Sequence, residues 1–156
     1  GAVTMMKEFS GILQNYCLLC ALFSWLIAQI LKSVVNIIQS RRISFVSLFA
    51  SGGMPSSHSA AVTSLATATG ITAGFDSPVF GVTVLFAFIV MYDATGVRRE
   101  TGRQAEVLNR LLADLDAGRT RDISVHLKTL VGHSPLQVFA GGALGILVAL
   151  VIYYIR

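Results

Sequence analysis

The chain has 156 residues, of which 54 % are hydrophobic and only 13 % are charged, and its net charge is +4. An ordinary soluble domain carries about 25 % charged residues, so this composition excludes one. No charged side chain lies between Glu8 and Lys32 or between His133 and Arg156, and a membrane helix needs about 20 apolar residues. The sequence therefore predicts an all-α integral membrane protein with a single membrane domain over residues 1–156.

Four transmembrane helices are expected in chain order. Their predicted ranges are 12–34, 57–74, 79–95 and 134–155. Between the first two, Ile43–Ala50 is apolar but too short to span a bilayer, so it is predicted to form a short re-entrant segment. The sequence AGFDSP, rich in turn-forming residues, separates the second helix from the third.

A charged loop, residues 96–132, follows the third helix and contains seven Lys or Arg residues and five acidic residues. Apolar residues recur at Val107, Leu108, Leu111 and Leu112, which is the spacing of an amphipathic helix. A shorter amphipathic helix is predicted over 121–131. Both are expected to lie along the membrane surface as interfacial helices.

The basic residues predict the orientation of the chain. With four spans, Arg41, Arg42 and the charged loop lie on one side, and only Lys7 and Arg156 lie on the other. Cytoplasmic loops are enriched in Lys and Arg, so the basic side is predicted to be cytoplasmic, with both termini outside. The location expected is a bacterial inner membrane or an organellar membrane.

Unusual polar residues gather on this same cytoplasmic side. They fall where helices end or begin: Lys32, Arg41, Arg42, Ser56, Ser57, His58, Asp93, Arg98, Arg99 and His133. Ionisable residues at membrane depth indicate function by default. Helix N-termini and arginines both bind anions, and Gly52 and Gly53 would let backbone N–H groups approach one.

Two histidines beside an anion site indicate phosphoryl chemistry. One histidine can attack phosphorus while the other protonates the leaving oxygen. The acidic residues are scattered and form no carboxylate cage. The reaction is therefore expected to need no metal and no other cofactor, and no nucleic-acid partner is expected.

Three motifs resemble those of the type-2 phosphatidic acid phosphatase and vanadium haloperoxidase superfamily. GGMPSSHSAAV resembles its P-S-G-H motif, GHSPLQVFAGGALGI resembles the end of its third motif, and the spacing from Lys32 to Arg42 resembles its first. Over nearly its whole length, including YDATGVRRETGRQAEVLN, the chain is similar to a divergent branch of short membrane proteins in this superfamily. The resemblance implies a lipid phosphatase acting through phosphohistidine.

The resemblance also implies roles for individual residues. His133 would be the nucleophile and His58 the general acid, while Lys32, Arg41 or Arg42, and Ser57 with its surrounding backbone, would hold phosphate oxygens. Several features depart from the pattern: Ser57 stands where the family has glycine, the first motif is longer and lacks a proline after its arginine, and two further positions call for replacements. Gln137 stands where an aspartate would orient the nucleophile, so Asp93 is the candidate replacement. Leu127 stands where an arginine is expected, so Arg98 or Arg99 would substitute.

Simpler interpretations remain open at this point. Ser56 or Ser57 is also a good helix N-cap, and His133 is also compatible with an interfacial side chain that reaches water. The chain could bind or translocate a phospholipid or anion without catalysis, or act as a scaffold. The resemblance implies a substrate such as phosphatidic acid, phosphatidylglycerol phosphate or polyprenyl diphosphate, and the sequence does not choose among them. A homodimer is considered, because four spans are few and the last helix is rich in glycine.

Overall fold

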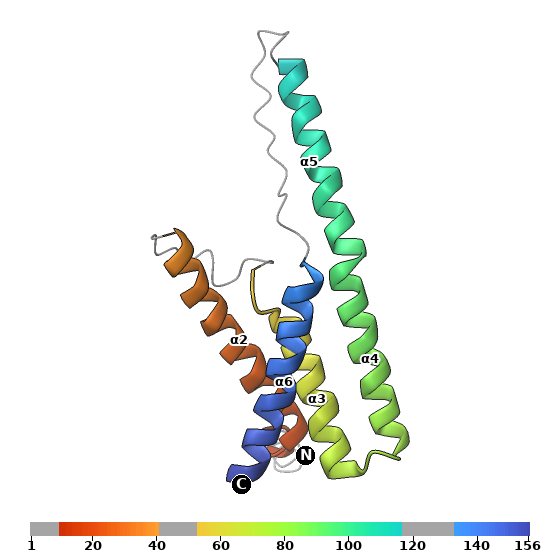
Figure 1. Ribbon diagram of the computed structural model, residues 1–156. Coiled ribbons are helices and arrows are strands. Elements are labelled where there is room, and N and C mark those ends of the chain that lie inside the picture. Colours follow the sequence, from red (N-terminus) through yellow and green to blue (C-terminus); the bar gives the residue numbers. More distant parts are fainter. Residues whose placement is uncertain (1–9, 41–52, 117–132) are drawn as a thin grey trace, which may run out of the picture.

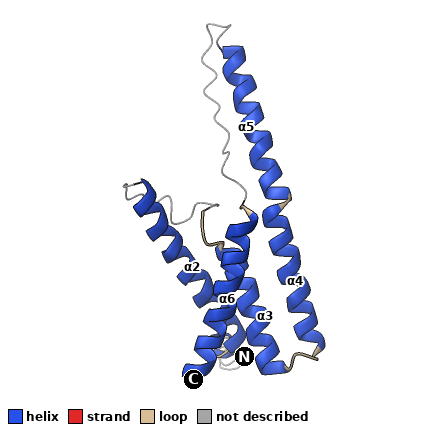
Figure 2. Ribbon diagram, viewed as in Figure 1, coloured by secondary structure: helices blue, strands red, loops and turns tan. Residues whose placement is uncertain are grey.

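The computed structural model describes residues 10–40, 53–116 and 133–156. All regular secondary structure in these residues is helical (Figure 2). The helices are α2 (Tyr16–Ser40), α3 (Ser57–Ala73), α4 (Pro78–Thr95), α5 (Val97–Asp116) and α6 (Pro135–Ile155) (Figure 1). The prediction of an all-α membrane protein is confirmed. The predicted re-entrant segment and the second amphipathic helix lie outside the described residues.

Three described helical segments are long and apolar enough to cross a membrane. They are Tyr16–Ile38, Pro78–Ala113 and Pro135–Ile155. Helix α3 has 17 residues, which is at the lower limit of about 17 for a spanning helix. The total of four spans therefore stays a prediction.

Short polar residues mark where the helices begin. Asn15 caps α2 by accepting a hydrogen bond from the Leu18 N–H at 3.0 Å. Ser56, Ser77 and Ser134 cap α3, α4 and α6 in the same way. These bonds satisfy N–H groups that have no partner within the helix. At the other end of α3, Gly74 adopts a φ of 95°, a conformation that glycine adopts without strain.

Helix α3 lies at the centre of the bundle and contacts α2, α4 and α6. It is built largely from Ala, Ser, Thr and Gly, which let neighbouring helices approach closely. Its contacts with α2 are reciprocal: Ser24 donates to the Ala60 carbonyl at 3.1 Å and Ser64 donates to the Cys20 carbonyl at 3.0 Å. Buried hydroxyls are thereby satisfied where no water is present.

The contact between α3 and α6 depends on glycine. A Cβ atom added at Gly141 would collide with the backbone oxygen of Ser56, and one at Gly145 would collide with that of Ala60. Thr63 also donates to the Gly142 carbonyl at 2.9 Å. These glycines allow a close approach between helices, and the helix that approaches is α3 of the same chain. They therefore give no support to the homodimer, which stays a prediction.

Helices α4 and α5 follow one another almost without interruption. Gly96 N–H donates to the Tyr92 carbonyl at 2.9 Å and Glu100 N–H donates to the Gly96 carbonyl at 3.0 Å, so helical bonding continues through the junction. Helix α5 extends the direction of α4 beyond the end of the bundle (Figure 1). The predicted amphipathic helix forms, but it continues away from the bundle instead of lying along its end, and the one non-helical residue at the junction, Gly96 (φ −100°, ψ −89°), does not redirect it.

Candidate functional site

Two backbone hydrogen bonds bring three helix ends together at one end of the bundle. The Ser56 N–H donates to the Gln137 carbonyl at 3.0 Å, and the His133 N–H donates to the Ala94 carbonyl at 3.2 Å. The start of α3 is thus joined to the start of α6, and the segment before α6 is joined to the end of α4. These three helix ends lie at the same end of the bundle, whereas the C-terminal end of α2 stands apart from α6 (Figure 1).

Lys32 of α2 packs against the loop that leads into α3. Its side chain is buried, with a residue exposure of 3 %. A Cβ atom at Gly53 would lie 3.1 Å from both Cγ and Cδ of Lys32, and Gly53 has a φ of 91°. The loop therefore needs glycine at this position for its conformation and for its approach to the lysine stem. A cation this deeply buried in a membrane helix is costly unless it is paired or functional.

The two histidines differ in exposure. His133 is 4 % exposed and directly precedes Ser134, the N-cap of α6. Protein encloses its side chain, so the interpretation as an interfacial residue that reaches out to water is wrong. His58 lies in the first turn of α3 and is exposed. A buried nucleophile and an exposed proton donor, at the starts of two helices that the Ser56–Gln137 bond joins, would fit this pair.

Ser56 has a structural role in this site. Its side chain is fully buried and caps α3 by accepting hydrogen bonds from the Ser59 N–H at 3.4 Å and the Ser59 hydroxyl at 3.0 Å. These bonds support the capping interpretation for Ser56. Ser57 is 4 % exposed and begins α3, so its backbone lies at the helix N-terminus, where N–H groups favour an anion.

Gln137 forms a capping box with Ser134. Its Oε1 accepts a hydrogen bond from the Ser134 N–H at 3.0 Å, and its own N–H donates to the Ser134 hydroxyl at 3.4 Å. Its carbonyl also accepts the bond from Ser56. Gln137, at the predicted orienting position, therefore links α6 to the loop before α3. The sequence S-P-L-Q carries the capping-box signature from which this role could have been read.

The other candidates are placed less completely. Asp93 is half-buried in the last turn of α4, next to the residue whose carbonyl holds His133. The backbone of Arg98 and Arg99 lies in the first turn of α5, and Arg41 and Arg42 lie outside the described residues.

Asn36 is a residue near the site that the sequence did not indicate. Its Oδ1 would lie 3.7 Å from a Cβ at Gly53. Within the described ranges no group of three or more His, Cys, Asp or Glu side chains is placed to hold a metal ion.

The apolar helices and the polar end of the bundle define this chain as a helical integral membrane protein. The Divergent PAP2 family matches residues 13–148, and the chain belongs to that family. It is also 42 % identical over 153 residues to "Uncharacterized membrane protein YuiD" of Bacillus subtilis (strain 168), covering 92 % of this chain and 97 % of the relative. No solved structure matches the chain.

Proposed function

We propose that the protein is a metal-independent membrane phosphatase that hydrolyses a phosphomonoester or diphosphate of a lipid. The observation that carries the proposal is the junction of helix ends, where the buried His133 is held to the end of α4 and the start of α6 is joined to the start of α3. Membership of the Divergent PAP2 family supports a phosphatase-related role.

The proposed reaction has two steps. An imidazole nitrogen of His133 attacks phosphorus, the bond from phosphorus to the lipid oxygen breaks, and His58 gives its proton to that oxygen. Water then attacks the phosphohistidine, transferring a proton to His58 and releasing phosphate. Lys32 and the N–H groups at the start of α3 would stabilise charge on the phosphoryl oxygens, which is the main source of catalysis in such reactions. Arg41 or Arg42, with Arg98 or Arg99, would complete the phosphate site.

The active site is proposed to face the cytoplasm. The basic residues of the chain are concentrated on the side where α3 and α6 begin, and cytoplasmic loops carry an excess of Lys and Arg. Helix α5, which extends beyond the bundle at that end, would then project into the cytoplasm (Figure 1). A reporter active only outside the cytoplasm, fused after Arg156, is expected to be active, and inactivity would reverse the assignment.

Phosphate release from a panel of lipid phosphates tests the activity. The purified full-length protein is incubated with phosphatidic acid, phosphatidylglycerol phosphate and a polyprenyl diphosphate. Release from at least one is expected, with loss of activity in His133→Ala and a reduction of about 10²- to 10⁴-fold in His58→Ala. His126→Ala is the matched histidine control and should retain the wild-type rate. Wild-type rates in His133→Ala and His58→Ala would disprove the mechanism.

A second function is favoured by the position of Gln137. Its side-chain oxygen is used in the capping box, and an amide stabilises an imidazolium less than a carboxylate does. The protein would then bind or translocate a phospholipid or other anion in the same pocket without cleaving it. This alternative predicts saturable binding of phosphate or vanadate with no turnover of any lipid in the panel.

A further inference from the structure

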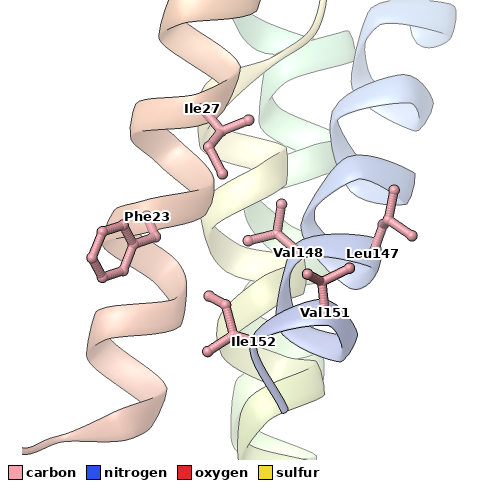
Figure 3. A pocket seen from close by; sticks show the side chains of 6 residues that line it. All are labelled: Phe23, Ile27, Leu147, Val148, Val151 and Ile152. Atoms are coloured by element: carbon pink, nitrogen blue, oxygen red, sulfur yellow. The ribbon is translucent and has the colours of Figure 1, made fainter. Parts of the chain in front are cut away.

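An apolar groove lies between α2 and α6, in the part of the bundle away from the polar end. Its volume is about 300 Å³, and six hydrocarbon side chains line it: Phe23, Ile27, Leu147, Val148, Val151 and Ile152 (Figure 3). Phe23, Leu147 and Val151 are also exposed at the surface of the bundle. The groove therefore opens sideways, toward the lipid phase.

We propose that this groove holds a hydrocarbon chain of the same lipid whose phosphate binds near His133 and Lys32. The inference rests on the lipid-phosphate binding of the proposed function. It specifies the ligand further, as a lipid phosphate with a long chain rather than a short-chain or water-soluble phosphoester.

One side of α6 runs from the polar end to the groove. Gln137, Ala140, Leu144 and Val148 follow one another at spacings of three or four residues, so they share one side of the helix. The first three are half-buried, whereas Gly141 and Gly145 face α3. This side of α6 therefore leads from the helix start, where His133 lies, down to the groove.

Helix α2 provides the opposite wall. Ile27, Leu31 and Val34 also recur at spacings of four and three residues and are 36 %, 41 % and 46 % exposed. Above the groove the C-terminal end of α2 stands apart from α6 (Figure 1). Apolar side chains thus border the route from both helices, as a hydrocarbon chain requires.

The depth of the groove fits a chain that extends through one leaflet. From Lys32 the groove begins at Ile27, about 8 Å along the helix axis, and continues to Phe23, about 14 Å along it. From Gln137 to Val148 the corresponding distance is about 16 Å. One leaflet contributes about 15 Å of hydrocarbon. A chain of that length reaches the groove, and a chain of half that length does not.

Photolabelling tests the occupant without requiring catalysis. The probe is phosphatidic acid with a photoactivatable diazirine near the end of one chain, added to the full-length protein in phosphatidylcholine nanodiscs. Label is expected on peptides containing Ile27 and Val148–Ile152 and should fall when unlabelled dioleoyl phosphatidic acid is added. Equal labelling of Val82 and Phe88 on α4, or no competition, would show that bulk lipid fills the groove and would overturn the proposal.

Substitutions that fill the groove test its role in chain selection. Wild-type protein should release phosphate faster from dioleoyl than from dihexanoyl phosphatidic acid. Ile27→Trp should lower that ratio by about threefold to tenfold. The effect is expected to be modest because an acyl chain that enters the groove leaves equally apolar lipid, so it gains only from closer packing. Val151→Trp is the second variant if Ile27→Trp does not fold, and Val82→Trp, on exposed α4, is the matched control.

The outcomes separate the two proposals. An unchanged ratio in both groove variants overturns the chain site while leaving the phosphatase intact. Competed labelling of the groove with no phosphate release from dioleoyl phosphatidic acid or any other lipid of the panel overturns the phosphatase, and the chain site then belongs to the lipid-binding alternative.

Discussion

The backbone N–H of His133 donates a hydrogen bond to the carbonyl of Ala94 at 3.2 Å. These residues are 39 positions apart, and the charged loop and α5 lie between them. The end of α4 and the residue before Ser134 therefore lie at almost the same point of the bundle. The bond holds the proposed nucleophile against the last turn of α4, where the neighbour of Ala94 is Asp93.

Asp93→Asn is expected to impair the chemistry more than the fold. If Asp93 stabilises the imidazolium of His133, loss of its charge should reduce phosphate release by about 10²- to 10⁴-fold, the range seen when an orienting carboxylate becomes an amide. The thermal midpoint should change little. Asp76→Asn, in the exposed turn between α3 and α4, is the matched control and should behave as wild type. An active Asp93→Asn would assign the orienting role elsewhere.

Gln137→Leu is expected to destabilise the protein by about 1 kcal/mol, because it removes the capping-box bond to Ser134. Gln137→Glu keeps an acceptor at the same position and should retain stability. The measurement is the free energy of unfolding in mixed detergent micelles as the SDS fraction rises. Equal losses in both variants would mean that the capping bond is not the stabilising feature.

Much of the helical fold was predictable because its signals are local. The uncharged gaps, the serines before α3 and α6, and the proline at the start of α6 are all readable in the chain. The direction of α5 was not, since a glycine at position 96 permits both a turn and continued helix.

The site was predictable only in part. The residues that would gather at one end follow from helix order, but the burial of His133 and the packing of Lys32 against Gly53 depend on contacts between distant segments. The capping role of Gln137, by contrast, depends only on local sequence. S-P-L-Q carries the capping-box signature, whereas the family resemblance concerns only the aspartate expected at this position.

Gly141→Ala should destabilise the protein, whereas Gly81→Ala should not. A Cβ at position 141 meets the backbone of Ser56, which cannot move away as a flexible side chain can, whereas nothing lies within 4 Å of a Cβ at position 81. Gly141→Ala should therefore destabilise by about 1–3 kcal/mol through overpacking. Gly81→Ala should be neutral or stabilising by up to about 1 kcal/mol. The same detergent titration measures both, and a neutral Gly141→Ala would contradict the tight contact between α3 and α6.

Lys32→Met should separate anion binding from folding. The substitution removes a buried cation and keeps most of the apolar stem that packs against Gly53. Because a charge at membrane depth is costly, the variant should fold at least as well as wild type. Its affinity for vanadate should fall by about tenfold or more, the effect of losing one charge-assisted hydrogen bond worth about 1.5–3 kcal/mol.

Titration calorimetry with orthovanadate measures this affinity. The measurement does not require catalysis, so it applies whether the protein is a phosphatase or only binds the anion. Arg110→Met is the matched control, since it removes an equal charge from the exposed ion pair with Glu106 on α5 and should leave vanadate affinity unchanged. Equal losses of vanadate affinity in both variants would mean that the net positive charge of the protein, and not Lys32 itself, attracts the anion. Wild-type affinity in Lys32→Met would remove Lys32 from the anion site and leave the buried ammonium with a structural role only.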